Sequence, residues 1–537
     1  MNKDDIKKIF KARFDKARER WDAYRTDMRD LYRFAFPAGE CLFDDAKSRE
    51  RTVYDSVLAR AIERRVKKTH SALFPPYREF MDFDPADPAA VDESPENKDK
   101  WDKIYADAKK KFHLAIMDSN FHTEFDLAGA DMLLVFSGFA VHEGTAAHPL
   151  VFEAIHPAMM YPGRAFEGIV REKFRRQMIP FCEIRDYWPD ALIDKDKEKE
   201  TAEAEVVDGY LFDAQKRVYT YVVTVNDDVV LYQEDIKNPD IFIIRSDGKT
   251  GSDVGYSRAM SVLPDVRSAD KTRELILKKA AFDLNGIWAA EDGSVVNMDA
   301  IKNLKPGDWV FFNRNSQMPK PLYNGTGFDL SQMVLGDLHS IVQNAVEGPT
   351  LPAENSGSRR SAYEYQLRQG EIDATELPSY LRLLYEMQPV FDRVVEILTD
   401  PKFADSPYYI RLPDVTVKGK EKKLSLSPVS PMIRKQDEAD NQRSLQALTV
   451  ALQINPQSVA DIVDIEGYLR AFLDNGGFPS EFIRPAKEVE QQRQARAQAE
   501  QQAEMMAQAQ AQAEQQAPDP SDMTEAAGVV LPQEGVF

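Results

Sequence analysis

Three consecutive segments decide the fold: PDVRSADKTRELILKKAAFDL (residues 264–284), an insert that begins NGIWAAEDG and ends NGTGF (285–328), and DLSQMVLGDLHSIVQNAVE (329–347). In the first and third segments, apolar residues recur at helical spacing and gather on one face of each predicted helix. Gly348 and Pro349 then end the third segment. The pattern predicts two helices of roughly 30 Å that flank a small strand-containing insert.

Two interpretations fit this pattern. One is an ordinary helical hairpin with a β insertion, and the other is a stalk of paired helices that presents a small β knob to a partner. The aromatic residues of the insert suit both, because they can form its own small core or anchor a partner. These residues are Trp288, Trp309, Phe311 and Phe312.

Composition limits the possible functions. The 537-residue chain is long enough for two to four domains, and it carries 69 Lys and Arg against 89 Asp and Glu, a formal net charge of −20. This balance argues against a protein that holds DNA or RNA tightly through phosphates, although nucleic acid could pass loosely along a locally basic strip. Two cysteines are too few for a disulfide scaffold, and we expect an intracellular protein without signal peptide or membrane-spanning segment.

The segments before the stalk alternate between helix and strand patterns. Residues 3–36 predict one amphipathic helix and residues 53–73 a second. The second is basic, and a solvated face or a phosphate-facing strip would both explain its Arg60, Arg64, Arg65, Lys67 and Lys68. Strand-like runs at 218–225, 229–233 and 241–245 predict a small antiparallel sheet.

The segments after the stalk are mainly helical in pattern. Residues 362–398 predict a long helix that Pro378 and Pro389 should kink or break. Residues 434–475 predict two or three short helices. Residues 486–516 are almost wholly Ala, Gln, Glu and Arg, which fits a solvated helix or a disordered tail, and residues 517–537 predict disorder. The fold class that we predict is α+β and predominantly helical.

Short motifs give no support for catalysis. Gly248-Lys249-Thr250 follows a predicted strand, but a phosphate-binding loop needs a glycine where Ile243 stands. His142 and His148 are six residues apart, so they cannot share a helical face as the two histidines of a zinc-protease helix do. We therefore predict no catalytic residue, no metal and no cofactor.

Four stretches resemble one known family, the head-to-tail connector or portal proteins of short-tailed (podovirus) bacteriophages. They are LARAIERRVKKTHSALFPPYREFMDF (58–83), FDLAGADMLLVFSGFAVHEG (125–144), VGYSRAMSVLPDVRSADKTRELILKKAAFDLNGIWAAEDG (254–293) and SAYEYQLRQGEIDATELPSYLRLLYEMQPVFDRVVEIL (361–398). The order of these elements and the Gln/Ala/Met-rich C-terminus carry the likeness, which extends over roughly residues 10–510.

The resemblance implies a ring, usually of twelve subunits, at one vertex of the virion capsid, with double-stranded DNA passing through its channel during packaging and ejection. It assigns residues 1–255 and 362–400 to a wing, 256–284 and 329–348 to a stem, 285–328 to a clip, 349–361 to a channel loop, 401–485 to a crown and 486–516 to a C-terminal helical barrel. The implied partners are terminase, tail adaptor, major capsid and scaffolding proteins. Assembly would take place in the host cytoplasm.

If the chain has this role, the residues themselves suggest candidates for the DNA channel and for partner contact. Candidate channel cations are Arg359 and Arg360 on the loop and Lys278 and Lys279 on the stem, for which a solvated helix face is the alternative. The aromatic residues of the insert become candidate contacts of the clip. Other classes that fit the sequence are a tail-tube or internal virion protein and, less readily, an unrecognised hydrolase or nuclease.

Overall fold

A computed structural model gives the fold of the chain. The chain divides into two compact units, Met1–Ile433 and Arg434–Phe537. The structure describes residues 3–37, 42–43, 52–85, 95–192, 201–226, 229–248, 254–285, 288–289, 320–321, 328–348, 362–411, 424–428, 431–454, 459, 463–475 and 486–515.

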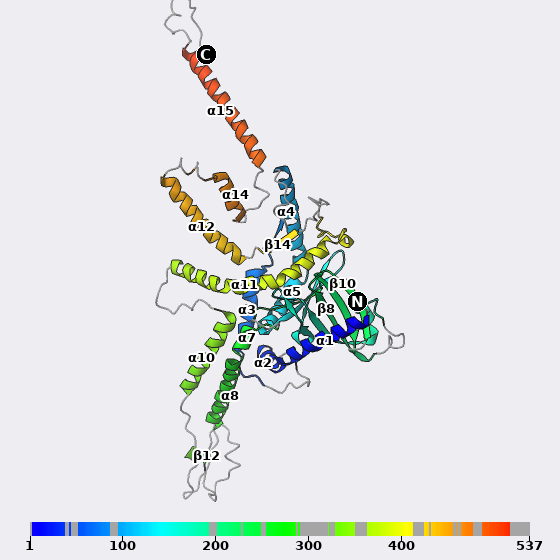
Figure 1. Ribbon diagram of the computed structural model, residues 1–537. Coiled ribbons are helices and arrows are strands. Elements are labelled where there is room, and N and C mark those ends of the chain that lie inside the picture. Colours follow the sequence, from blue (N-terminus) through cyan, green and yellow to red (C-terminus); the bar gives the residue numbers. More distant parts are fainter. Residues whose placement is uncertain are drawn as a thin grey trace, which may run out of the picture. The chain divides into compact units, whose positions relative to one another are not determined.

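The first unit mixes helices and antiparallel strands, which confirms the predicted α+β class (Figure 1). Its helices are α1 (Lys3–Asp22), α2 (Arg25–Ala35), α3 (Val57–Leu73), α4 (Pro95–Met117), α5 (Phe121–Leu134), α6 (Ile184–Tyr187), α7 (Arg258–Ser261), α8 (Leu263–Asn285), α10 (Phe328–Glu347) and α11 (Ala362–Thr399). Its strands are β1 (Met81–Pro85), β2 (Ser137–Glu143), β3 (Leu150–Ile155), β4 (Met160–Pro162), β5 (Ala165–Phe166), β6 (Ile169–Val170), β7 (Lys173–Pro180), β8 (Glu203–Asp213), β9 (Val218–Val225), β10 (Val229–Ile236), β11 (Ile241–Ile244), β12 (Trp288–Ala289), β13 (Lys320–Pro321) and β14 (Leu424–Pro428).

The N-terminal segment forms α1 and α2, so the single helix predicted over residues 3–36 is wrong at its centre. The break is a turn at residues 23–24, where the Tyr24 N–H donates to the Trp21 carbonyl at 2.9 Å. Burial explains it, because the turn redirects the chain and lets both apolar faces reach the core. On α1, Phe10 packs edge-on against Phe174 of β7, with ring centroids 5.2 Å apart.

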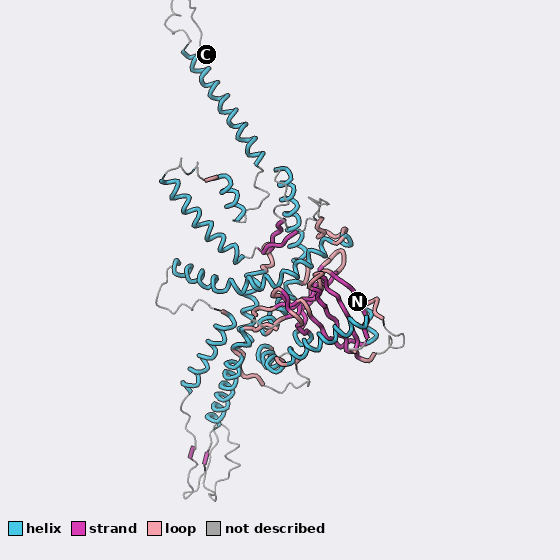
Figure 2. The backbone as a smooth tube through the Cα atoms, in the orientation of Figure 1, coloured by secondary structure: helices cyan, strands magenta, loops and turns pink. Residues whose placement is uncertain are grey.

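Two antiparallel sheets organise the first unit, and Figure 2 shows their strands gathered on one side of it. One sheet has the order β10-β9-β8-β7-β4 and the other the order β11-β2-β3. The predicted pairing of β9 with β10 is confirmed, but β11 belongs to the second sheet. Its side chains alternate between two cores, Ile241 and Ile243 in one and Phe242 and Ile244 in the other. A strand whose two faces are both buried lies between two packed layers, whereas the predicted small sheet would have had one face in solvent.

Phenylalanine rings build the second of these cores and join elements that are far apart in sequence. Phe74, which directly follows α3, lies edge-on to Phe125 of α5 at 4.9 Å and to Phe391 of α11 at 5.6 Å. Edge-to-face aromatic pairs add to the free energy gained by burying the rings. This core fixes α11 against α3 and α5.

The long helix α11 contains Pro378 and Pro389 and is still assigned as one helix from Ala362 to Thr399. The prolines therefore do not break the helix, and a kink, the other predicted outcome, stays a prediction. Each proline costs its helix one backbone hydrogen bond. The helix buries Leu384, Met387 and Phe391 in the phenylalanine core, and this apolar burial offsets the missing hydrogen bonds.

Gly138 of β2 lies opposite Ile155 of β3, with no room for a side chain. A Cβ atom there would lie 2.8 Å from Met160 Cγ and 2.9 Å from Ile155 Cβ, both in the core. We expect Gly138→Ala to lower the free energy of unfolding by about 1–3 kcal/mol, because overpacking forces neighbours from their positions. Urea titration followed by circular dichroism measures this. Val151→Ala, at an exposed position of β3, is the control, and equal effects of the two changes would contradict the prediction.

The second unit is helical where the structure describes it. It contains α12 (Pro431–Ile454), which begins just before the unit boundary, α14 (Ile465–Asn475) and α15 (Ala486–Gln515). The hydroxyls of Ser444 on α12 and Tyr468 on α14 are 2.8 Å apart. Helices are thus present within 434–475, but α12, at 24 residues, is longer than predicted, and the Ala/Gln-rich segment is a helix. Residues 517–537 lie outside the described part of the chain.

Candidate functional site: the helical stem and its anchors

The stem, defined here as α8 and α10, consists of two helices that lie side by side and extend away from the strands (Figure 1). At 23 and 20 residues they are about 35 and 30 Å long. Beyond their far ends, β12 and β13 pair antiparallel, with Trp288 opposite Pro321. The chain therefore leaves one helix, passes through an insert whose two arms pair, and returns along the other helix.

The apolar side chains of the stem fall into a buried group and an exposed group. Near the core, Val266 and Ala269 of α8 and Val342 and Val346 of α10 are buried. Other apolar side chains of the two helices are 44–67% exposed, including Ile341, which directly precedes the buried Val342; these are Leu275, Leu277, Met333, Val334 and Ile341. Val334 and Ile341 belong to the stripe predicted from the sequence, so only part of that stripe packs within the chain. Exposed apolar side chains such as these are candidates for burial against a partner.

The first anchor of the stem is Asp55, which lies directly before α3. Its side chain is 2% exposed, and its Oδ2 lies 2.7 Å from His339 Nε2 of α10 and 3.4 Å from Arg273 Nη1 of α8. A carboxylate of the stem also contacts this segment: Asp270 of α8 accepts hydrogen bonds from the backbone N–H groups of Tyr54 and Asp55 at 2.6 and 2.9 Å. One short segment thus holds both stem helices.

The electrostatics of this anchor favour an ionised carboxylate. Burial alone would raise the pKa of Asp55, but hydrogen bonds from His339 and the Val57 N–H, together with the charges of His339 and Arg273, lower the pKa below its ordinary value of 3.8. Asp55 is therefore charged at neutral pH, where it attracts the Arg273 guanidinium of α8 and lies within hydrogen-bond distance of His339 of α10.

Asp55→Asn should lower the free energy of unfolding by about 1–3 kcal/mol at pH 7, because charge-assisted hydrogen bonds are lost. A carboxyl group with a depressed folded pKa contributes fully above its unfolded pKa, here about 4, and loses that contribution as the pH falls through the folded pKa. The difference in free energy of unfolding between wild type and variant should therefore shrink on acidification from pH 7 to about pH 3. Urea titrations along this series measure it, and a constant difference would contradict the prediction.

The second anchor is the Arg65 cluster, defined as Arg65 of α3, Arg258 of α7, Glu347 of α10 and Glu376 of α11. Arg65 Nη2 lies 2.5 Å from Glu376 Oε2, with the two side chains 5% and 2% exposed. Arg65 Nη1 also donates to the Glu347 carbonyl at 3.2 Å, and Arg258 Nη1 lies 3.2 Å from Glu376 Oε1. Burial acts to raise the pKa of Glu376, but Arg65 and Arg258 outweigh it and lower the pKa.

The Arg65 cluster lies where the chain leaves the stem. Gly348, the residue after α10, has a φ of +80°, and a side chain there would collide with the Glu376 carboxylate. Glycine adopts this left-handed conformation without steric cost. Glu347 and Glu376 therefore lie on the two sides of the predicted channel loop, and one buried arginine contacts both.

Sequence reasoning missed these anchors. It grouped Arg65 with its basic neighbours as a solvated or phosphate-facing residue, and this is wrong because Arg65 is buried against Glu376, 311 positions later in the chain. A basic run gives no signal of which member turns inward. Asp55 carried a weak signal, since an acidic residue before a helix can accept a hydrogen bond from the helix N-terminus.

The structure describes only some of the site residues that the sequence predicts. Lys278 is exposed and lies 2.5 Å from Glu274, whose hydrogen bond raises the pKa of the lysine. Lys279 follows it on α8, and Trp288 is part of β12. The remaining candidates, Trp309, Phe311, Phe312, Arg359 and Arg360, lie outside the described residues.

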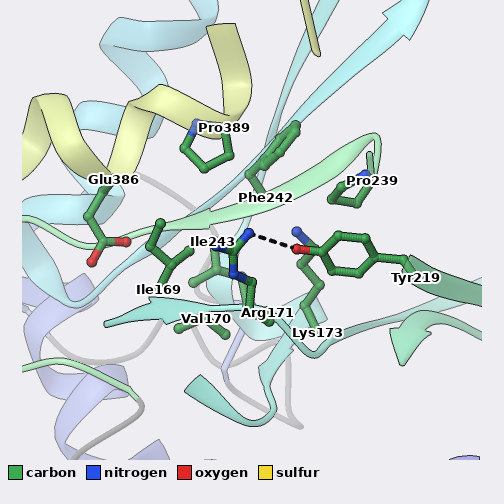
Figure 3. Close-up of a pocket in the computed structure, with 10 residues that line it drawn as sticks. All are labelled: Ile169, Val170, Arg171, Lys173, Tyr219, Pro239, Phe242, Ile243, Glu386 and Pro389. Atoms are coloured by element: carbon green, nitrogen blue, oxygen red, sulfur yellow. Dashed lines mark hydrogen bonds between the residues drawn. The ribbon is translucent and has the colours of Figure 1, made fainter. Parts of the chain in front are cut away.

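A small cavity between the strands and α11 is interior packing rather than a ligand site (Figure 3). Its volume of about 10 Å³ suits roughly one water molecule. Lys173 lines it and lies 4.6 Å from the centre of the Phe242 ring; burial, and then the neighbouring Arg171, lower the lysine pKa well below its ordinary value. On the far side, Glu386 pairs with Arg245 at 2.6 Å.

Two structural features are absent from the described residues. In that part of the chain, no group of three or more His, Cys, Asp or Glu side chains is arranged to hold a metal ion. None of the helices with described positions is both long and apolar enough to cross a membrane.

Comparison with known proteins identifies the family. The model of a family described as bacteriophage head to tail connecting protein matches residues 7–483. Among solved structures, one entitled "Neck of empty GTA particle computed with C6 symmetry" is similar over 78% of this chain and 90% of that chain, at 11% identity and a TM-score of 0.34. No curated protein matches. Because the family match covers most of the chain, this protein belongs to the bacteriophage head-to-tail connecting proteins, a family of structural components of the virion.

Proposed function

We propose that copies of this chain close into a ring at one vertex of the capsid, and that double-stranded DNA passes through the ring during packaging and ejection. The observation that carries the proposal is the set of exposed apolar side chains on the two stem helices. Leu275 and Ile341 lie on helices that are packed and anchored at one end, yet both side chains face solvent. A neighbouring copy that covers this surface would bury it, and repeated heterologous contacts of this kind close a ring.

The anchors support a stem that keeps its position in such a ring. Asp55, just before α3, contacts both stem helices, and Arg65 of α3 contacts α10 and α11. A ring of identical subunits needs each interface at the same angle, and a stem free to swing would not maintain that angle. We assign residues 1–255 and 362–400 to the wing, 256–284 and 329–348 to the stem, 285–328 to the clip, 349–361 to the channel loop, 401–485 to the crown and 486–516 to a helical barrel.

The charge of the chain suits passage of DNA rather than its retention. With a net charge of −20, most of the wall would repel phosphates, and a few cations would touch them weakly. We assign this role to Arg359 and Arg360 on the channel loop and to Lys278 and Lys279 on the stem. The pairing of Lys278 with Glu274 reduces its net attraction for phosphate.

The proposed partners follow from the position of the ring. Terminase would dock on the clip during packaging and tail adaptor proteins afterwards, with Trp288, Trp309, Phe311 and Phe312 as clip contacts. Capsid and scaffolding proteins would surround the ring. The chain itself would hydrolyse no nucleotide.

Mass photometry of the purified full-length chain tests the assembly. We expect one large species at a whole multiple of the 61.0 kDa chain mass, with twelve copies as the usual number in portal rings. A single species at the mass of one chain, at all concentrations and salt conditions tried, would contradict the proposal.

A further inference from the structure

The strand β1 belongs to a two-stranded sheet in the described part of the chain. Its partner is β14, and the two run antiparallel with Met81 opposite Pro428. After β14 comes α12, the helix that leads into the second unit. A sheet of two strands is marginally stable in water and needs support from a packed neighbour. The position of β14, and of the chain that leads into the second unit, therefore depends on what holds β1.

One histidine of α4 holds the start of β1. His113 Nε2 lies 2.9 Å from the backbone nitrogen of Phe80 and 3.3 Å from that of Met81. A backbone N–H can only donate, so Nε2 carries no proton and accepts both hydrogen bonds. The proton of the neutral ring is then on Nδ1, which donates to the Lys109 carbonyl oxygen at 2.8 Å. Both ring nitrogens are therefore satisfied by backbone groups, but only while the ring is uncharged.

The contact has no substitute if the ring takes up a second proton. Phe80 and Met81 are 2% and 0% exposed, so water cannot replace the imidazole as the acceptor of their N–H groups. The rings of Phe80 and Phe112 lie edge-on to the imidazole, at 4.9 and 5.4 Å. Protonation of Nε2 turns an acceptor into a donor that faces two donors, and a buried N–H without an acceptor costs about as much as a lost hydrogen bond.

The surrounding charges leave the ring neutral at pH 7. Burial lowers the pKa of His113 below its ordinary value of 6.5, and the charge of Lys109 lowers it too, while the Lys109 carbonyl and the carboxylates of Glu79 and Asp82 raise it. Lys109 Nζ lies 3.0 Å from the Glu79 carboxylate and 3.1 Å from that of Asp82, so it offsets both. The other charged or titratable side chains that line the adjoining cavity are Arg78, Lys110 and His122.

Acid acts on this contact in one direction. A histidine in the unfolded chain takes up its proton near pH 6.5, whereas His113 in the folded chain takes it up only at lower pH. The folded form therefore loses stability as the pH falls from about 6.5 towards the folded pKa. Movement of β1 away from α4 exposes the same ring without unfolding the whole chain, so acid favours this open form as well.

We propose that His113 is a pH-sensitive switch whose protonation releases β1 from α4, and β14 together with it, while the rest of the first unit stays folded. The released element is the two-stranded sheet that precedes the second unit. Because only its contact with α4 is given up, this opening costs less free energy than global unfolding. Histidine suits the task because its charge changes within a few pH units of neutrality.

Hydrogen–deuterium exchange of the full-length protein at about pH 7 and about pH 4, resolved to single amides and corrected for intrinsic exchange rates, tests the proposal. Phe152 is the internal reference: its N–H donates to Asn120 Oδ1 at 2.8 Å, an acceptor that does not titrate, and its ring lies in the same phenylalanine core. On acidification, the amides of Phe80 and Met81 should lose at least about tenfold more protection than that of Phe152, because two hydrogen bonds to buried donors are lost. The amides of β14 should lose protection with them.

His113→Gln supplies an acceptor that does not titrate, because the glutamine Oε1 can take the place of Nε2. In this variant the additional acid-induced loss at Phe80 and Met81 should disappear. His148→Gln is the matched control, since His148 is exposed between β2 and β3 and should leave the acid response as in wild type. Thermal unfolding followed by circular dichroism at pH 7 establishes that both variants are folded.

The wild-type measurement alone can overturn the proposal. Equal loss of protection at Phe152 would mean that acid unfolds the whole unit, and no additional loss at Phe80 and Met81 would mean that acid leaves the contact intact. Protection retained by β14 after β1 has lost it would refute the joint release of the two strands. An unchanged acid response in His113→Gln would show that another group is responsible.

Discussion

Arg65→Ala should lower the free energy of unfolding by about 3–5 kcal/mol, because it leaves Glu376 in the interior with its main counter-charge removed. The cost arises from the buried carboxylate rather than from the lost attraction alone, since a charge taken out of water needs a partner to offset its lost hydration. Loss of Arg65 also removes a donor to the last carbonyl of α10. Guanidinium titrations of wild type and variant at equal protein concentration measure the change.

Arg64 supplies the matched control for this experiment. It is the preceding residue on α3 and pairs with the side chain of Glu347 at 3.3 Å, but its own side chain is 62% exposed. Exposed ion pairs contribute little, so Arg64→Ala should change stability far less. The double variant with Glu376→Gln should be less destabilised than the two single effects combined, by on the order of 1–3 kcal/mol. Equal effects of Arg64→Ala and Arg65→Ala would refute the role of the cluster.

Leu275→Glu combined with Ile341→Glu should abolish ring assembly while leaving each chain folded. Both side chains are about half exposed in the single chain, so glutamate there costs little before assembly. In the ring they would be covered, and each apolar side chain of this size contributes about 1.5–3 kcal/mol on burial. Two such losses at every interface, together with two carboxylates buried without partners, should weaken association by more than about 100-fold. Sedimentation velocity measures the distribution between ring and single chains.

Val229→Glu is the control for the stem variant. Val229 is 51% exposed on β10, far from the stem in sequence and on a different element, so its replacement introduces the same charge outside the proposed interface. This variant should assemble as wild type does, and thermal unfolding should show all variants folded. If the stem double variant still formed complete rings, the apolar surface on α8 and α10 would not be the contact between copies.

The parts of the fold that were predictable from the sequence are those with local causes. Helical spacing of apolar residues placed α8 and α10 to within about two residues. Alternating β-branched residues and a short turn placed β9 and β10 and their pairing. In each case the residues that carry the signal are close in sequence to the structure they determine.

The features that the sequence did not predict depend on contacts between distant segments. Ile241–Ile244 is a clear strand, but its place beside β2 depends on residues about 100 positions earlier. Arg65 looks like its basic neighbours until Glu376 is known to lie against it. The aromatic candidates Trp309, Phe311 and Phe312 and the loop arginines Arg359 and Arg360 stay predictions, because they lie outside the described residues.

Cryo-electron microscopy of the purified full-length protein tests the central claim most directly. The account predicts closed rings with a central opening, in which α8 and α10 of each copy pack against the stem of the next and cover Leu275 and Ile341. Single chains only, or an assembly in which the outer faces of both stem helices stay in solvent, would contradict it.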